Sequence, residues 1–185
     1  GSDAGRGGAA HRGRRARGGR LGANLVAATY GLGVRCDAVK AIVIGCGRVG
    51  SAVAQQLQAS GWEVTVCDEN EDALGRLGEQ WTGGFLVGHG MDFQLFKEAG
   101  IEEADAVVVT TDGDNTNIVI AQIAQKRYEV PTVIARVLDP LRAEWYQRQG
   151  LHTVCPTSVA IDMLESAVRK GGEGGDPTDG AAAAA

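Results

Sequence analysis

Three glycines and one carboxylate at a fixed spacing are the residues of this chain whose types point most directly to chemistry. Gly45, Gly47 and Gly50 follow the apolar run 41–44, and Asp68 comes 18 residues after Gly50, at the end of a second apolar run. A Gly-x-Gly-x-x-Gly turn between a strand and a helix, with an acid closing the next strand, is typical of dinucleotide-binding folds.

Each glycine has a distinct physical role in such a turn. Gly45 lets the backbone leave the strand sharply, Gly47 leaves room for a pyrophosphate to touch the main chain, and Gly50 lets the next helix pack close to the sheet. The first amides of that helix are free donors at the positive end of its dipole. The turn is therefore predicted to hold an anion.

The acidic end of the second strand bears on the sugar. Asp68 can accept hydrogen bonds from a ribose diol, and Glu69 beside it adds a second negative charge that would repel a 2′-phosphate. NAD(H) is therefore favoured over NADP(H). ATP, ADP and AMP also have a free 2′-hydroxyl, so the acid does not separate them from NAD(H).

The elements that must position these residues alternate along the chain. Six short runs, most of them apolar on both faces, predict strands of a buried parallel sheet. The strands are predicted at 41–44, 64–66, 85–87, 106–109, 132–137 and 153–155, and the helices at 48–60, 70–80, 92–99, 114–128, 139–149 and 157–170. This alternation predicts an α/β fold, a Rossmann-like doubly wound parallel sheet of about six strands. Ligands of such folds bind at the carboxyl ends of the strands, so the loops 88–92 and 110–114 and Arg136 should line the same crevice.

Length and charge restrict the classes of function. The 185 residues suffice for one domain; residues 1–39 are predicted to be a disordered Arg/Gly-rich arm, opening with a Gly1-Ser2 that resembles a tag scar. Residues 1–20 carry six Arg and one Asp, net +5, so the rest of a chain of net charge −5 carries −10. That charge argues against a nucleic-acid-binding core. Residues 171–185 are predicted to be a low-complexity tail.

Two further features leave alternatives open. Arg14-Arg15 before the mildly apolar residues 21–34 raises the possibility of a twin-arginine export signal, although that stretch is far too short to span a membrane. The four cysteines have no metal-ligand spacing and suit a reducing compartment. Cys46 and Cys67 would lie beside the bound nucleotide, so redox sensitivity of that pair is a hypothesis to test.

Ordered motifs over about residues 40–170 resemble the landmarks of the RCK domains, also called TrkA-N or KTN domains. The motifs are the turn 45–50, the strand ending at Asp68, and the segments 87–90, 96–101, 104–117 and 133–137. RCK domains regulate potassium channels and Trk/Ktr potassium transporters. Many members have Gly-Asp-Ala where this chain has Gly88-His89-Gly90, and the His-Gly form is more similar to the TrkA proteins of the transporter branch.

The resemblance implies roles for the predicted site residues. The glycine turn would hold the phosphates with a charge-assisted contact from Arg48, Asp68 would hold the adenosine ribose, and His89 with Gly90 would flank the adenine. Arg136 would face the phosphates or the second half of a dinucleotide, and Thr111-Asp112 would close over the crevice. The predicted site for NAD(H) or ATP/ADP/AMP is Gly45, Cys46, Gly47, Arg48, Val49, Gly50, Asp68, Glu69, His89, Gly90, Thr110, Thr111, Asp112 and Arg136, with no catalytic or metal-ligating residue. Asn117 is expected to cap or brace its helix rather than bind nucleotide.

The resemblance also implies an assembly. Residues 157–170 carry a broad apolar face, and in RCK proteins the corresponding helix crosses over to a partner subunit, which leaves 40–156 as the nucleotide-binding domain. A homodimer or larger gating ring is expected, although packing of this helix on its own sheet stays open. The partner would be a membrane potassium transporter or channel subunit. The chain would then be cytoplasmic and peripheral to the inner face of the membrane, without inserting into it.

Three function classes follow from these residues. The leading hypothesis is a cytoplasmic nucleotide-binding regulatory subunit or domain, not an enzyme. The first alternative is an NAD-dependent dehydrogenase. Two features argue against it: the sequence has no Tyr-x-x-x-Lys motif, and His152 is isolated. The second is a fragment of an S-adenosylmethionine methyltransferase, which also uses a glycine loop and an acid after the second strand.

Overall fold

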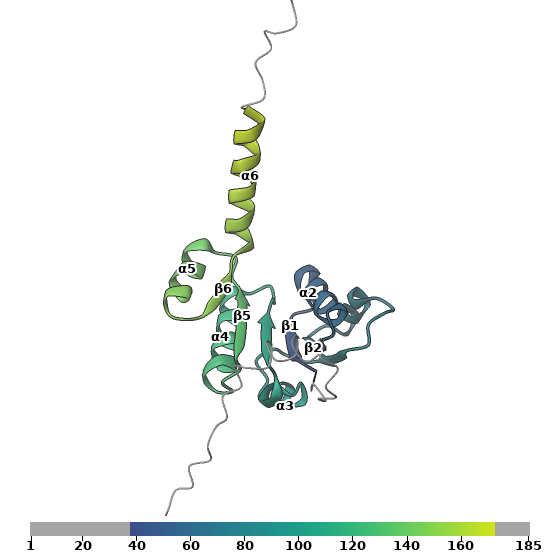
Figure 1. Ribbon diagram of the computed structural model, residues 1–185. Helices are drawn as coiled ribbons and strands as arrows, with labels where there is room; N and C mark the ends of the chain where they lie inside the picture. Colours follow the sequence, from purple (N-terminus) through teal and green to yellow (C-terminus); the bar gives the residue numbers. More distant parts are fainter. Residues whose placement is uncertain (1–37, 173–185) are drawn as a thin grey trace, which may run out of the picture. The chain divides into compact units, whose positions relative to one another are not determined.

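The computed structural model describes residues 38–172 (Figure 1). The predictions for the arm before residue 38, for the export signal at 21–34 and for the tail beyond residue 172 lie outside the described residues. Within the described part of the chain, no helix combines the length and the apolar character that crossing a membrane requires.

Strands and helices alternate along the described chain, as the hydrophobic pattern predicts. The strands are β1 (Lys40–Ile44), β2 (Glu63–Asp68), β3 (Gly84–Val87), β4 (Ala106–Val109), β5 (Thr132–Arg136) and β6 (His152–Val154). The helices are α2 (Arg48–Ala59), η1 (Glu71–Leu77), α3 (Phe93–Glu98), η2 (Ile101–Glu103), α4 (Asp114–Lys126), α5 (Pro140–Arg148) and α6 (Pro156–Gly172).

The six strands form one parallel sheet in the order β3-β2-β1-β4-β5-β6. The chain winds outward from β1 to β3, crosses to β4 beside β1, and winds outward again to β6, which is the doubly wound topology that the sequence predicts. Ile44 pairs with both Cys67 and Val109, and Val109 pairs with Ala135. This register brings the carboxyl ends of β2, β1, β4 and β5 to one edge of the sheet.

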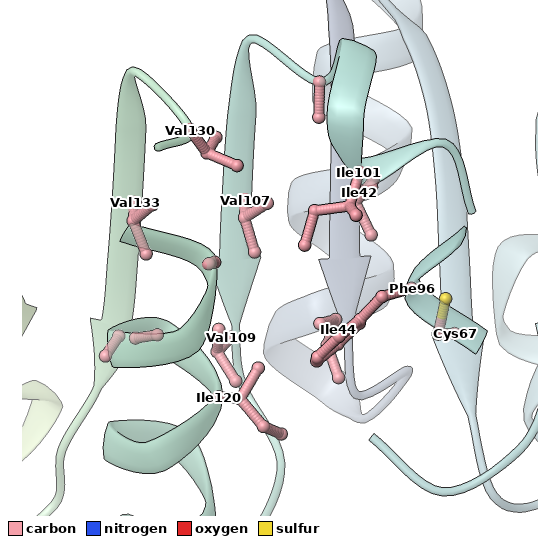
Figure 2. Close-up of a cluster of buried hydrophobic side chains, with 14 of the residues drawn as sticks. Ile42, Ile44, Cys67, Phe96, Ile101, Val107, Val109, Ile120, Val130 and Val133 are labelled. Atoms are coloured by element: carbon pink, nitrogen blue, oxygen red, sulfur yellow. The ribbon is translucent and has the colours of Figure 1, made fainter. Parts of the chain in front are cut away.

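Two apolar layers cover the two faces of the sheet. On one face, Ala41 and Val43 of β1 pack in a cluster with residues of α2 and η1. On the other face, Ile42 and Ile44 pack in a larger cluster with Phe96 of α3 and with residues of α4 and α5 (Figure 2). Alternate residues of β1 thus face opposite layers, and all four are at most 2% exposed. The site at the end of β1 rests on a strand that is buried on both sides.

The segment after β2 differs from the prediction of a helix over 70–80. It is a 3₁₀ helix, η1, which begins after Asn70, whose side chain accepts a hydrogen bond from the amide of Asp72, and ends at Gly78 with φ +73°. Gly75 lies inside it and disfavours a longer α-helix. On this helix, the side chain of Arg76 reaches the carbonyl of Cys46 in the turn after β1.

Helix α6 leaves the end of β6 (Figure 1). Residues 159–170 are all exposed, among them Val159, Ile161, Met163, Leu164 and Val168, which are between 52% and 75% exposed. The described residues of this chain therefore leave an apolar helix face uncovered.

Candidate functional site

A cavity of about 550 Å³ lies at the carboxyl ends of the strands. It runs from the ends of β2 and β3, past the turn after β1, to the ends of β4 and β5. Its lining residues are Ile44, Gly45, Gly47, Arg48, Val49, Cys67, Asp68, Glu69, Asn70, Arg76, Gly88, Gly90, Thr110, Thr111, Asp112 and Arg136.

Two glycines of the turn are required by close packing. Gly45 has φ +96°, and a Cβ on it would lie 2.7 Å from the amide nitrogen of Thr111. A Cβ on Gly50 would lie 1.8 Å from the carbonyl oxygen of Gly45, so this helix approaches the turn more closely than any side chain allows. Thr110, which is buried, donates from Oγ1 to the Gly45 carbonyl at 2.9 Å and so fixes the turn from β4.

Gly47 differs from the other two because it faces open space. Apart from Gly47 itself and its two neighbours in the chain, no described residue has a heavy atom within 4 Å of the position its Cβ would take. Gly47 also caps α2 without any side-chain hydrogen bond, and the first turn of that helix holds no acid among the described residues. The opening of α2 therefore presents its amides and the positive end of its dipole to the cavity, as a phosphate site requires.

The carboxylate of Asp68 is held in place by two backbone amides. Its Oδ2 accepts from the amide of Cys46 at 2.6 Å, and its Oδ1 accepts from the amide of Asn70 at 2.9 Å. Asp68 is half-buried and lines the cavity. Each carboxylate oxygen has further acceptor capacity, so the group can bind a diol while these two bonds fix its orientation.

His89 contacts Glu69 and the backbone of its own loop. Its Nε2 lies 3.3 Å from Oε1 of Glu69, its Nδ1 accepts from the amide of Met91 at 3.2 Å, and its side chain is 53% exposed. Gly88 and Gly90 line the cavity, whereas His89 is not among the lining residues described. Contact between His89 and adenine therefore stays a prediction.

Buried Asn117 joins the two loops at the far end of the cavity. Its Nδ2 donates to the carbonyl oxygens of Thr111 and Arg136, each at 2.9 Å, and its Oδ1 accepts from the hydroxyl of Thr111 at 2.6 Å. Asn117 is fully buried, and its side chain braces the loop after β4 and the end of β5 rather than capping its own helix. The loop after β4 and the end of β5 are held together by one side chain.

Arg136 lies at the β5 end of the cavity and makes one hydrogen bond to the loop after β4. Its Nη2 donates to the Thr111 carbonyl at 2.6 Å, while its buried Nε has no hydrogen-bond partner among residues 38–172. A buried donor without a partner is costly in a folded protein. The positive charge of this half-buried arginine, which lines the cavity, suits an anionic ligand.

The cavity lining contains equal numbers of acidic and arginine side chains. The three acids are Asp68, Glu69 and Asp112, and the three arginines are Arg48, Arg76 and Arg136. Sequence reasoning identified every one of these except Arg76. The lining also includes Ile44, Cys67, Asn70 and Gly88, which are outside the predicted site, whereas the predicted Cys46, Gly50 and His89 are not among the lining residues. The sequence indicates only that a basic residue follows Asp68 by eight positions. A helix predicted over 70–80 does not tell whether the side chain of Arg76 points toward the cavity.

The two cysteines beside the cavity are poor nucleophiles. Burial, and then the Asp68 carboxylate, raises the pKa of the Cys67 thiol to about 12. Burial and then Asp68 also raise the pKa of the Cys46 thiol, against a smaller opposing effect of Arg76. Both residues are at most 1% exposed. Because the thiolate is the reactive form, this environment disfavours the redox hypothesis for the pair.

Comparison with protein families identifies the domain type. Residues 41–157 match the family model of the TrkA-N domain. The Trk system potassium uptake protein TrkA of Streptomyces coelicolor is 43% identical over 142 residues, which are 75% of this chain and 64% of that protein. A TrkA homologue of Methanothermobacter thermautotrophicus is 29% identical over 130 residues, which are 70% of this chain and 60% of that protein. The chain thus spans less than two thirds of the length of these relatives.

Solved structures share the fold. The Kef CTD of Shewanella denitrificans in its AMP-bound form has a TM-score of 0.61 at 24% identity, covering 72% of this chain and 82% of that one. The GsuK channel bound to NAD has a TM-score of 0.63 at 22% identity, covering 74% of this chain and 24% of that one. Both confirm the Rossmann-like fold of β1 to β6.

Proposed function

The chain belongs to the TrkA-N domain family, and from that premise we propose that it is a nucleotide-binding regulatory domain. It binds NAD(H) or an adenine nucleotide, and the bound state biases a potassium transporter or channel. The alternatives of a dehydrogenase and a methyltransferase have less support.

One observation carries this proposal, namely the extent of the cavity. Asp68 lies at its β2 end, Gly47 and the start of α2 lie in the middle, and Arg136 lies at its β5 end. From β2 to β5 the cavity crosses three strand spacings of about 4.8 Å, or about 14 Å. A diol-binding acid, a phosphate-binding turn and a cation therefore follow one another along one space, in the order of a nucleotide's parts.

The type of nucleotide follows from the acids and from the fold neighbours. Asp68 and Glu69 together disfavour a 2′-phosphate, which supports NAD(H) or ATP, ADP and AMP over NADP(H). The neighbours include a domain in an AMP-bound form and a channel bound to NAD. The fit of the residues present supports the same ligands, since Gly47 leaves the main chain open and Arg136 brings a positive charge to the cavity.

Regulation requires that the nucleotide bind two states of the protein with different affinity. Asn117 ties the cavity loop at Thr111 to the end of β5, and the amide of Val137 after β5 donates to the carbonyl of Val154 in β6 at 3.0 Å. β6 leads directly into α6. Closure of the loops around a ligand can therefore move the base of α6.

The assembly expected from the family completes this proposal. The exposed apolar residues of α6 form the surface of a homodimer or larger ring, with 157–170 as a crossover helix and 40–156 as the nucleotide-binding domain. The assembly acts in the cytoplasm, at the inner face of the membrane, through a potassium transporter or channel subunit. The TrkA relatives, named as potassium uptake proteins, support this partner.

A regulatory rather than catalytic role is supported by the relatives, which are named as potassium uptake proteins.

Isothermal titration calorimetry with NADH, NAD, ATP, ADP, AMP and S-adenosylmethionine tests the proposal, together with assays of NADH oxidation with aldehydes and of NAD reduction with alcohols and hydroxy acids. We expect saturable binding of at least one of the first five ligands, without turnover. Binding of S-adenosylmethionine alone, or steady turnover of NAD(H), would support one of the alternatives and reject the regulatory role.

A further inference from the structure

Arg76 is a charged residue of the cavity that the nucleotide site as proposed above does not use. We propose that Arg76 determines the affinity for the base, with the plane of its guanidinium lying against the face of the adenine. This inference rests on the proposed nucleotide binding and adds a residue to that site.

Two contacts hold Arg76 against the glycine turn and against α2. Its Nη1 donates to the carbonyl of Cys46 at 3.3 Å, and the amide of the same Cys46 donates to Asp68 at 2.6 Å. Its own carbonyl accepts from Nε2 of Gln55 in α2 at 3.2 Å. Arg76 and Asp68 are thus held on the two sides of one residue of the glycine turn.

The other two arginines of the lining lie elsewhere. Arg48 is the first residue of α2 and Arg136 is the last residue of β5, so both belong to the phosphate part of the cavity. Arg76, on η1, is the lining arginine that follows β2 and its terminal Asp68 in the chain, and it shares Cys46 with Asp68 as a hydrogen-bond partner. If Asp68 holds the ribose, the group beside Arg76 is the base or the 2′-substituent of that ribose.

Charge decides between these two groups. A 2′-phosphate next to Arg76 would also lie next to Asp68 and Glu69, so one cation would face two carboxylates as well as the phosphate. Adenine carries no charge and avoids this repulsion. The hydrogen bond to Cys46 uses an N–H in the plane of the guanidinium and leaves its faces open, and a guanidinium face stacks well on an aromatic base.

The test compares two substitutions of Arg76 with a matched control. Arg76→Lys keeps the positive charge but lacks the planar guanidinium, and Arg76→Ala lacks both. Arg148→Ala removes an arginine of α5 whose side chain is 71% exposed and which is not among the lining residues. Dissociation constants for AMP, NAD and NADP are measured by calorimetry on the whole chain, and a thermal unfolding curve of each variant checks that it folds.

We expect Arg76→Lys and Arg76→Ala each to lower the affinity for AMP and for NAD by roughly tenfold. Arg148→Ala should leave these affinities unchanged. Every variant should bind NADP more weakly than NAD. Full affinity in Arg76→Lys, or a loss restricted to NADP, would overturn the stacking role. Unchanged affinity for AMP and NAD in Arg76→Ala would overturn any role of Arg76 while leaving nucleotide binding intact. If the unsubstituted chain binds none of the three ligands, this inference and the proposed function fail together.

Discussion

Gly47 and Gly50 stand three positions apart and are glycines for opposite reasons. At Gly50 a Cβ would collide with the protein itself, 1.8 Å from the Gly45 carbonyl, whereas at Gly47 a Cβ would meet nothing within 4 Å. Gly50 is therefore required by the fold. Gly47 is required only if something outside the chain occupies the space in front of it.

Substitution of Gly47 separates folding from binding. We expect Gly47→Ala to lower the free energy of unfolding by about 1 kcal/mol or less, since alanine is a poorer N-cap than glycine, and to weaken nucleotide affinity at least about tenfold, because the methyl group occupies the phosphate position. Urea denaturation and calorimetry measure the two effects.

Gly75→Ala is the matched control for Gly47→Ala. Its Cβ would also meet nothing within 4 Å, and Gly75 is not among the lining residues of the cavity. Wild-type affinity is expected in the control. Wild-type affinity in Gly47→Ala as well would show that no phosphate approaches the turn.

Cys67 makes stability depend on alkaline pH. In the folded protein its thiol has a pKa of about 12, above the ordinary value of 9.0 that applies to the unfolded chain. Below pH 9 the thiol is protonated in both states. Above pH 9 the unfolded chain loses this proton while the folded protein keeps it, so the free energy of unfolding falls as the pH rises, by up to about 1.4 kcal/mol per pH unit.

Cys67→Ala removes this group and should make the fall between pH 9 and pH 11 shallower than in the unsubstituted chain, as measured by urea denaturation at each pH. Other groups titrate in this range in both proteins, so only the difference between the two slopes is diagnostic. Equal slopes would mean that the thiol ionises in the folded protein as readily as in the unfolded chain.

Among the elements, the strands and the glycine turn could be predicted from the sequence, and η1 could not. The apolar runs of β1 and β4 and the spacing of Gly45, Gly47 and Gly50 are local signals, and the structure places them as expected. The 3₁₀ form of η1 depends on Gly75 and Gly78 and on packing against α2, which is not local. For that reason the position of Arg76 beside Cys46 could be found only in the structure.

Asn117 shows a second limit of the same kind. Its type and its place on α4 predict a bracing role, but its partners are a loop and a strand that the chain reaches six and nineteen residues away. Sequence spacing does not reveal which carbonyls an amide will meet. The link between Thr111 and Arg136 is therefore a finding of the structure.

This link carries a prediction for the elements that it joins. Asn117→Ala leaves the carbonyls of Thr111 and Arg136 without this donor in a buried place, so we expect the free energy of unfolding to fall by about 2 to 4 kcal/mol. Nucleotide affinity should fall too, because Arg136 is less firmly placed. Chemical denaturation and calorimetry measure both.

Asn115→Ala, in the same helix, is the control for this prediction. Asn115 is exposed and accepts a hydrogen bond from Arg142 on the surface, so its loss should change stability by about 0.5 kcal/mol or less. Similar losses of stability and affinity in the two variants would contradict the role given to Asn117 in joining the loop after β4 to the end of β5.

At the scale of the whole molecule, α6 presents an apolar face that the described residues leave uncovered. Met163, Leu164 and Val168 are 67% to 75% exposed. Several large apolar side chains exposed on one helix are typical of an interface between proteins. A second copy of the same helix would provide a matching surface.

The double substitution Leu164→Asp with Val168→Asp tests this assembly. Burial of the two carboxylates in an interface is costly, so we expect the dimer to dissociate into monomers at micromolar concentration in sedimentation-velocity experiments. Ser166→Asp adds a charge to the same helix at a polar position and should leave the dimer intact. A monomeric unsubstituted chain, or an unaffected double variant, would contradict the role given to α6.

The central claim is that the cavity between Asp68 and Arg136 binds an adenine nucleotide, and the free energy of unfolding with and without ligand tests it most directly. For the unsubstituted chain, a nucleotide among NADH, NAD, ATP, ADP and AMP at one hundred times its dissociation constant should add about 2.7 kcal/mol. Asp68→Ala should lose this increment, whereas Asp162→Ala, which removes an exposed acid of α6, should keep it. If none of the five nucleotides stabilises the unsubstituted chain, or if Asp68→Ala is stabilised as much, the claim is contradicted.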